Sequence, residues 1–456
     1  MIAKISIKKI YFVFLFLHLF LWTLAPSISN INLPLDTIEA LAWGSDLEWG
    51  FNKHPPLSAV AVEIFYQIFG SQDWAYYLLS QIFVISTFYI IFKFANEFFN
   101  NIKLAVVATL LLEAIFYYNF TTPEFNVNIA QLPFWTLSVF LTWRCITRDK
   151  TIDYILLGLC FGLGILSKYL FLYLILSINL LLVYYIFKKK KINIKNFFLT
   201  GLVSLLVVTP HLFWLIENNF ITLTYGLKRA GGLVHLIDHV KLPLYFVIKQ
   251  LGILLPFFLL SIILLNKFKI KLILDEKKVF LIFVSLMPIF LIFLTSVILG
   301  SKIRTMWMTP FYLFFGILFI EFYKKNLNLK KIKKFYYAFL FIFFISPLLY
   351  LGISLSNDFK RTDYPGKEIA RLVQERWNKN FYNEIKYVVG DEWFAGNLSY
   401  HLKSRPKWTN DFKNEALKLE INEGVIYTGN PKILKSICPG IYGTIKPVGY
   451  CMIGQR

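Results

Sequence analysis

The sequence predicts a polytopic α-helical membrane protein that carries a small C-terminal α/β domain. Of its 456 residues, 57% are hydrophobic and only 16% are charged, and the mean hydropathy is +0.57. Soluble domains are about a quarter charged, so a water-soluble globule fits poorly. The net charge of +21 does not indicate nucleic acid as a partner, because the lysines stand in short clusters between apolar runs. In that position they set the orientation of membrane helices.

Apolar runs of about 18 residues indicate transmembrane helices, and we expect eleven of them. The first run, from Ile10 to Ala25, follows MIAKISIKK and so imitates a signal peptide. No small-residue cleavage site follows it, so we expect an uncleaved first helix. The expected spans lie near 10–29, 74–92, 104–118, 125–143, 152–167, 169–187, 196–216, 243–266, 279–299, 305–323 and 335–355.

The basic residues test this topology. If the N-terminus is cytoplasmic and the spans alternate, the inside segments hold 24 lysines and arginines, and the outside segments before the tail hold 7. The positive-inside rule asks for this asymmetry. The run 56–69 is too short to cross and is expected to lie in the interface, since a further span there would invert every later loop. The first external loop, 30–73, then faces the same side as the C-terminal tail.

The chain from 357 to 456 is expected to form an extracytoplasmic α/β domain after a membrane domain at 1–356. Residues 366–378 have helical spacing of their apolar side chains, and 386–391 and 424–430 resemble short strands that end in turns. Cys438 and Cys451 lie in this tail. On the oxidising side of a bacterial membrane they could pair, and two unpaired thiols are an equal alternative.

The polar stretch 33–57 contains the first group of candidate catalytic and binding residues. Asp36 and Glu39 are three residues apart and share a face if the segment is helical. A partly desolvated carboxylate there could act as a general base. Lys53 and His54 precede Pro55-Pro56, which holds the backbone extended and presents a cation suited to a phosphate. The alternative is a solvated loop that only contacts lipid headgroups.

Other external polar residues are weaker candidates. Glu124 and Asn128 lie at the mouth of a helix, where the acid could instead complement the positive helix end. Lys168 and Arg304 stand at the outer ends of spans, where each could hold a phosphate or only anchor the interface. His235 and His239, with Asp238 between them, have a spacing that can place metal ligands on one helical face, although two histidines four apart are common by chance.

Several phosphate- and nucleophile-type motifs are missing from the sequence. The glycines of 158–164 (GLCFGLG) lie inside an apolar helix and follow no strand, so they favour helix packing over a phosphate cradle. No Ser/His/Asp arrangement stands out. The four cysteines have no CxxC spacing, which argues against a structural zinc site or a redox motif.

A set of motifs in this order resembles bacterial members of glycosyltransferase family 39, the superfamily of protein O-mannosyltransferases and of lipid A aminoarabinose and galacturonosyl transferases. The resemblance covers roughly residues 1–330, and the segment 363–406 is similar to the extracytoplasmic tail of the family. The motifs are LDTIEALAWG (35–44), NKHPPL (52–57), TTPEFNVN (121–128), GLGILSKY (162–169), TPHLFWLIENNF (209–220) and RTMWMTP (304–310).

The resemblance implies a GT-C fold, a polyprenyl-phosphate-linked sugar donor and inverting transfer on the extracytoplasmic side. It places the catalytic aspartate at Asp36 and the lysine that meets the donor phosphate at Lys53. The family often shows Asp-Glu where this chain has Asp36-Thr37, so Glu39 is the candidate for the second acid. Some relatives hold a divalent metal, for which His54, His235 or His239 would have to serve here.

The sequence thus leads to an expected enzyme in a bacterial inner membrane, with the N-terminus cytoplasmic and the C-terminus extracytoplasmic. Asp36 would take the proton of an acceptor hydroxyl, and Lys53, Lys168 and Arg304 would meet the donor phosphate. The expected acceptor is lipid A, lipopolysaccharide or another envelope glycan, with secreted protein as the alternative. A polytopic lipid or sugar transporter is the rival from another class, although transporters place polar sites at the midplane of paired repeats.

Overall fold

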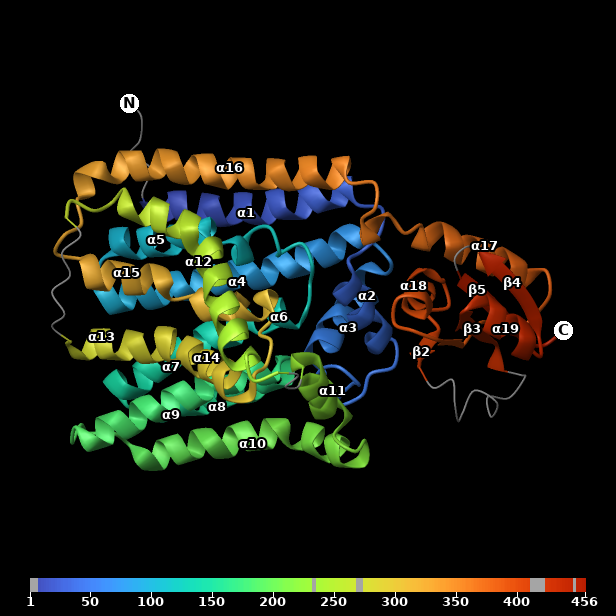
Figure 1. Ribbon diagram of the computed structural model, residues 1–456, viewed down its shortest axis with the longest axis horizontal. Coiled ribbons are helices and arrows are strands. Elements are labelled where there is room, and N and C mark those ends of the chain that lie inside the picture. The colour runs from blue at the N-terminus through green and yellow to red at the C-terminus, as the bar shows by residue number, and fades with distance from the viewer. Residues whose placement is uncertain (1–6, 232–234, 268–273, 411–422, 446–447) are drawn as a thin grey trace.

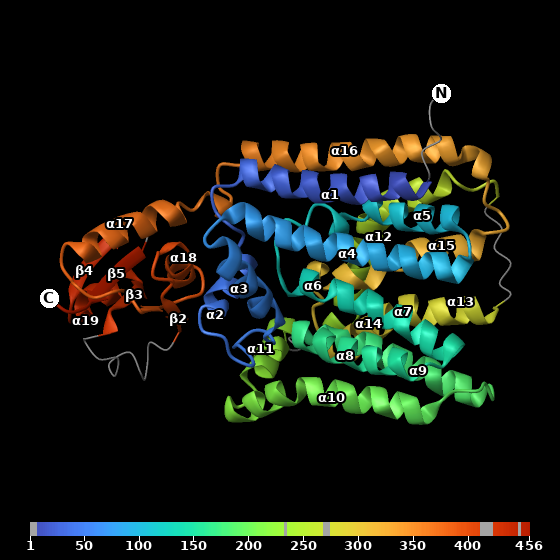
Figure 2. The same ribbon diagram turned by 180° about the vertical axis from the view of Figure 1, so that it is seen from behind.

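Two parts make up the structure, a bundle of apolar helices and a small α/β domain at one end of it (Figures 1 and 2). It is a computed structural model that describes residues 7–231, 235–267, 274–410, 423–445 and 448–456. The first helix, from residue 7, begins at the end of the bundle remote from the α/β domain (Figure 1). The turn that carries the lysine run 188–191 lies at that remote end as well. The bundle therefore separates this basic turn from the polar stretch 33–57, as the charge distribution predicts.

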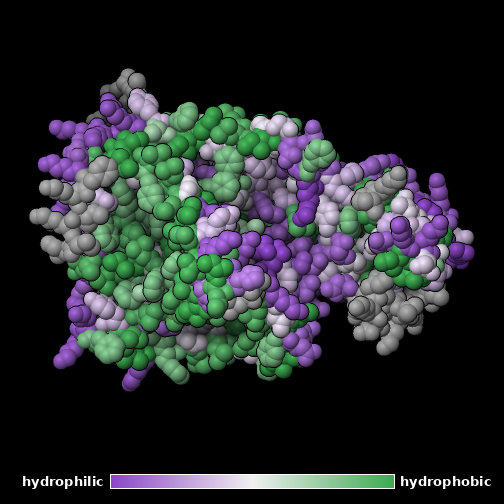
Figure 3. All heavy atoms as spheres, viewed as in Figure 1, coloured by the Kyte–Doolittle hydropathy of each residue, from purple (hydrophilic) through white to green (hydrophobic). Residues whose placement is uncertain are grey.

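Seven helices of the described chain are long and apolar enough to cross a membrane, and an eighth span is formed if a pair bent by 50° counts as one. Figure 3 shows the apolar surface of the bundle, with hydrophilic residues towards both ends. The protein is thus an integral membrane protein. The seven are α1 (Ile7–Ser29), α4 (Asp73–Phe99), η3 with α9 (Tyr169–Phe187), α10 (Ile194–Glu217), α12 (Asp238–Ile262), α13 to α14 (Glu276–Leu299) and α16 (Ile332–Ser356); the bent pair is η5 (Thr305–Tyr312) with α15 (Phe315–Tyr323).

The other three expected spans correspond to shorter elements, so the count of eleven stays a prediction. The run 104–118 holds α5 (Ile102–Leu110), which passes into two short 3₁₀ turns, Leu111–Ala114 and Phe116–Tyr118. Hydropathy records that all these residues are apolar, but it does not record where the helical hydrogen-bond ladder stops. The runs 125–143 and 152–167 hold α6 (Val127–Ala130), α7 (Leu132–Arg148) and α8 (Thr151–Ser167).

Two short helices cover the end of the bundle that faces the α/β domain (Figure 2). They are α2 (Leu35–Gly44) and α3 (Leu57–Phe69). With 13 residues, α3 reaches about 20 Å, which is well short of the roughly 30 Å of a bilayer core. The Pro55-Pro56 pair lies directly before α3, where proline is tolerated because the first helical N–H groups have no partner within the helix.

The C-terminal part is a five-stranded mixed sheet with helices around it. The strand order is β2-β1-β3-β5-β4; β1 runs parallel to β2 and β3, and β5 runs antiparallel to β3 and β4. Trp377 and other apolar side chains of α17 are buried against it, and a disulfide joins Cys438 to Cys451. Its elements are α17 (Gly366–Asn378), β1 (Tyr387–Val389), α18 (Phe394–His401), β2 (Lys407–Thr409), β3 (Val425–Gly429), α19 (Pro431–Ile437), β4 (Ile441–Ile445) and β5 (Val448–Ile453).

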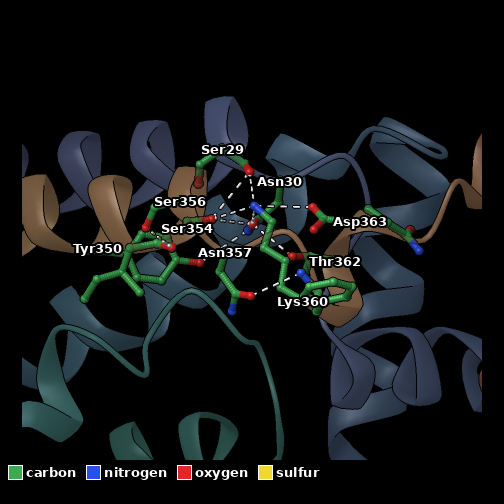
Figure 4. A network of polar contacts seen from close by, with 12 residues as sticks. Ser29, Asn30, Tyr350, Ser354, Ser356, Asn357, Lys360, Thr362 and Asp363 are labelled. Carbon is green, nitrogen blue, oxygen red and sulfur yellow. Dashed lines mark hydrogen bonds and ion pairs between the residues drawn. The ribbon is translucent and has the colours of Figure 1, made fainter.

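This domain contacts the bundle in several places, two of which are described first. In the segment after α16, Lys360 reaches the ends of both α1 and α16, donating to the Ser29 carbonyl and, at 2.7 Å, to the Ser354 hydroxyl (Figure 4). The second attachment is between α18 and α2, where Gly396 leaves so little space that a Cβ would lie 3.0 Å from Cβ of Ala42.

Polar contacts reinforce the second attachment. Arg405 donates to the Leu41 carbonyl at 2.6 Å and pairs with Glu63 at 2.8 Å. Lys407 pairs with Asp46 at 2.9 Å. Because α2 carries the first candidate acids, the α/β domain is held directly against the segment that the sequence singles out.

Candidate active site

Asp36 lies in the first turn of α2, and a loop distant in the sequence fixes its position. Its backbone N–H donates to Oε1 of Glu124 at 3.0 Å, and the hydroxyl of Thr37 donates to the carbonyl of Phe125 at 3.0 Å. Glu124 follows the turn at 116–118, in the loop that leads into α6. The two candidate acids, from segments far apart in the sequence, therefore meet at the start of α2.

Four cations act on Asp36. Burial raises the pKa of its carboxyl, and the nearby charges of Lys168, Lys53, Arg229 and Arg361 oppose that rise. Lys53 and Lys168 were expected at the site. Arg229, in α11 (Ile221–Ala230), and Arg361, in the segment after α16, were not identified from the sequence as site residues, because only the folded chain places them near α2.

Glu124 is half-buried. Burial raises the pKa of its carboxyl, and the neighbouring charge of Asp36 raises it further. The negative charge of Asp36 therefore favours the protonated form of Glu124 at a pH where an isolated glutamic acid has lost its proton. An acid that holds a proton beside a more acidic one is a common arrangement for proton transfer.

Lys53 connects the loop to both parts of the protein. Its Nζ lies 2.8 Å from Oε1 of Glu39 in α2 and 3.2 Å from Oε1 of Glu392 in the α/β domain. Asn52 donates to the same Glu392 oxygen at 3.0 Å. Burial lowers the pKa of Lys53, but the two carboxylates outweigh it and raise the value overall. Glu392 does not lie in a recognisable sequence motif, and no sequence pattern predicts that it lies next to Lys53.

Lys168 lies at the end of α8, where its Nζ donates to the side-chain oxygen of Asn128. The side chain is 7% exposed and lies 5.6 Å from the centre of the Trp307 ring. Burial lowers the pKa of Lys168 to about 7, against the attraction of Asp36. A change of pH near neutrality therefore changes the fraction of Lys168 side chains that carry a positive charge.

His54 lies between aromatic rings, with the Trp43 ring centre at 6.0 Å and the Tyr225 ring centre at 6.3 Å. Burial and the charges of Lys168, Lys53 and Arg229 lower its pKa to about 3, so the imidazole is neutral at physiological pH. The loop itself is anchored from the bundle: the Phe51 carbonyl accepts from the hydroxyl of Thr222 at 2.6 Å. This anchoring holds the backbone that presents Lys53.

The remaining candidates lie elsewhere. Arg304 makes no hydrogen bond or ion pair with these groups in the described chain, and it lines a separate cavity. Nδ1 of His239 lies 2.6 Å from the carbonyl of Val297, while the backbone N–H of His235 donates to Asp238. Over the residues that the structure describes, no three His, Cys, Asp or Glu side chains converge as metal ligands. These histidines therefore do not form a ligand set, and we derive no step through a metal.

The groups that do converge are named here the acid–cation cluster: Asp36, Glu39, Lys53, Glu124 and Lys168. It lies where the bundle, α2 and the α/β domain meet. Carboxyl groups with raised pKa values can accept or supply protons near neutral pH, and adjacent cations can stabilise an anionic leaving group. Perturbed titratable groups that converge in this way are typical of an active site.

Comparison with known proteins gives a family match and a fold. Residues 53–214 match the family described as dolichyl-phosphate-mannose-protein mannosyltransferase, a range that includes Lys53, Glu124 and Lys168. Two solved structures of ArnT from Cupriavidus metallidurans have a similar fold. The apo form is 12% identical, with 97% of this chain and 98% of that chain covered and a TM-score of 0.64.

The second ArnT structure, bound to undecaprenyl phosphate, is 11% identical over 98% of each chain, with a TM-score of 0.58. No curated protein matches the chain. Identities this low carry the fold and not the details of the site. The resemblance inferred from the motifs is confirmed at this level: the chain has the GT-C fold of ArnT, and its residues 53–214 carry the match to the mannosyltransferase family.

Proposed function

We propose that the protein is a membrane glycosyltransferase that moves a sugar from a polyprenyl-phosphate donor to an acceptor hydroxyl, with inversion, on the extracytoplasmic side of a bacterial inner membrane. The observation that carries the proposal is the acid–cation cluster, in which Asp36 lies among cations at one end of an apolar bundle. The fold supports it, because a structure with the same fold binds undecaprenyl phosphate. The placement of the N-terminus in the cytoplasm rests on the distribution of lysines.

Asp36 is the proposed general base. Its raised pKa brings the carboxylate closer to the pKa at which proton abstraction at neutral pH is efficient. The nearby cations keep a sufficient fraction ionised. Glu124 accepts a hydrogen bond from the backbone N–H of Asp36 and so helps to position it, while Asp36 keeps the proton that it takes from the acceptor hydroxyl.

Lys53 and Lys168 are the proposed partners of the donor phosphate. The leaving group of a polyprenyl-phosphate sugar is a phosphate, whose negative charge grows as the sugar departs, and fixed cations stabilise that change most effectively. Lys53 is held between Glu39 and Glu392, so little reorganisation is needed when a phosphate arrives. Arg304 has no part in this step, because it lines a different cavity.

Two classes of acceptor are candidates for this reaction. The resemblance to lipid A aminoarabinose and galacturonosyl transferases, together with the ArnT-like fold, favours lipid A or another envelope glycan. The description of the matched family favours the hydroxyl of a secreted protein. Both acceptors would reach Asp36 from the extracytoplasmic side, and we propose the envelope glycan as the first candidate.

The test compares envelope lipids, glycans and glycoproteins by mass spectrometry in cells with and without the protein. A product that disappears on deletion identifies the sugar and the acceptor. When the Asp36→Asn variant is expressed in the deletion cells, we expect that product to stay absent while the variant accumulates in the membrane at wild-type level. The matched control is Glu48→Gln, an exposed acid of the same loop, which should restore the product fully. Full restoration by Asp36→Asn would remove Asp36 from the mechanism.

A further inference from the structure

A second polar cavity lies in the bundle, and none of the residues that line it belongs to the acid–cation cluster. It has a volume of about 220 Å³ and lies between α12 and the segment 302–306, which includes the first residues of η5. In Figure 3 hydrophilic surface interrupts the apolar side of the bundle in the region where Figure 1 draws α12. The polar residues of its wall are Lys249, Gln250, Lys302 and Arg304.

Lys249 is the first unusual feature of this cavity. It lies near the middle of α12, a 25-residue helix apolar enough to cross a membrane, and its Nζ is 4.4 Å from the centre of the Tyr245 ring. Ionisable side chains inside membrane helices are costly and rare, and they generally mark a binding site or a pathway. The net charge of the cavity wall indicates which kind of ligand such a site would bind.

The cavity wall is positively charged. Among the residues that the structure describes, the wall contains three cations and no carboxylate. Neither Lys249 nor Lys302 nor Arg304 forms an ion pair with any residue that the structure describes. Three uncompensated positive charges around one small cavity repel one another, and an anion in the cavity removes that repulsion.

Gln250 provides the second, independent feature. It is only 6% exposed, and its Oε1 accepts from the hydroxyl of Tyr312 at 2.9 Å, which orients the amide. Its Nε2 has no partner in the described chain, and neither has the buried Nε of Arg304. Buried donors without a partner are rare because each has lost its hydrogen bonds to water. Both donors are on residues that line the cavity.

We propose that this cavity binds the phosphate group of a membrane lipid, as a site separate from the donor site at Asp36. A phosphate offers several acceptor oxygens and so can bind the three cations, including the Nε of Arg304, together with the amide of Gln250. The outer side of α12 is apolar, with Leu244 and Ile248 each more than half exposed, and so lies in contact with lipid chains. A phosphate that carries a lipid tail therefore fits better than free phosphate. The inference goes beyond the proposed function, because it holds whether or not a sugar is transferred.

The experiment counts lipid phosphates on the full chain by native mass spectrometry, with a short-chain polyprenyl phosphate as the probe. Wild-type protein is expected to retain two, and Lys249→Gln combined with Arg304→Gln to retain one. Affinity at the lost site should fall at least about tenfold, since hydrogen bonds to charged groups are among the stronger ones. The matched control is Lys241→Gln, an exposed lysine of the same helix outside the cavity, which should retain two.

Three results would overturn the proposal: a wild-type count of one, a count of two in the double variant, or an equal loss in Lys241→Gln. Because Lys249 is exposed, Lys249→Gln alone should fold normally and still weaken the second binding event. Displacement of the second lipid by millimolar inorganic phosphate would show that free phosphate is the ligand. The Asp36→Asn variant should still bind both lipids. Loss of transfer is therefore measured by the product, and loss of this site is measured by the lipid count.

Discussion

The ion pair of Lys53 and Glu39 allows the proposed catalytic effect of the Lys53 charge to be tested apart from its effect on stability. Their side chains are 20% and 12% exposed, and the two charged atoms are 2.8 Å apart. Lys53→Gln would leave Glu39 in a buried position without its nearest cation. Removing one partner of a fully buried ion pair costs about 3–5 kcal/mol, and the partial exposure here reduces that to about 2 kcal/mol.

The double variant Lys53→Gln with Glu39→Gln removes both charges, so it should recover most of this loss. For a chain of this length a change of about 2 kcal/mol corresponds to a shift of about 2 °C in the unfolding temperature. That shift is measurable on purified protein by thermal unfolding in detergent. The expected order of stability is therefore wild type, then the double variant, then Lys53→Gln.

Transfer activity should follow a different order. If Lys53 stabilises the departing phosphate, its loss should lower the transfer rate about a hundredfold, as the removal of one preorganised donor does elsewhere. The double variant should be as inactive as Lys53→Gln although it is more stable. A double variant that recovered activity together with stability would show that Lys53 only neutralises Glu39. The Glu39→Gln single variant measures whether Glu39 acts as a second acid.

Two further predictions concern Lys168 and the attachment of the α/β domain. Because burial lowers the pKa of Lys168 to about 7, its charge is lost as pH rises through 7, so donor use should fall there; Lys168→Arg, which keeps its charge, should move that fall to higher pH in a pH–rate profile. Arg405→Met removes the contacts to Leu41 and Glu63, and it should speed proteolysis between 357 and 365 about tenfold, whereas an unchanged rate would show that the other contacts suffice.

The architecture was largely predictable, because it follows from local patterns. The helix at 366–378 has the predicted bounds, and the strands at 387–389 and 425–429 lie inside the predicted segments. The membrane bundle follows from hydropathy, since a bilayer imposes length and composition on each span. The number of spans does not follow in the same way, because the apolar run after Ile102 breaks into 3₁₀ turns that composition does not reveal.

The site was predictable only where its residues are neighbours in the sequence. Asp36 and Glu39 share the short helix α2, as their spacing indicated. Glu392 lies 340 positions from Asn52, to which it is hydrogen-bonded, and only the docking of the α/β domain brings it to the loop. Arg304 and Lys168 both stand at the outer ends of expected spans, and sequence reasoning grouped them for that reason. The packing of α12 against η5 places Arg304 in a different cavity.

The position of Glu392 suggests why the α/β domain is attached so firmly to α2. Lys53 lies between an acid of the bundle side, Glu39, and an acid of the α/β domain, Glu392. Both acids lie on elements that Arg405 and the close packing of Gly396 hold together. A lysine side chain is long and loses considerable rotamer entropy when it is fixed, so two anchors from opposite sides reduce its freedom before any substrate binds. The domain thereby contributes to the geometry of the site through Lys53, without supplying the base.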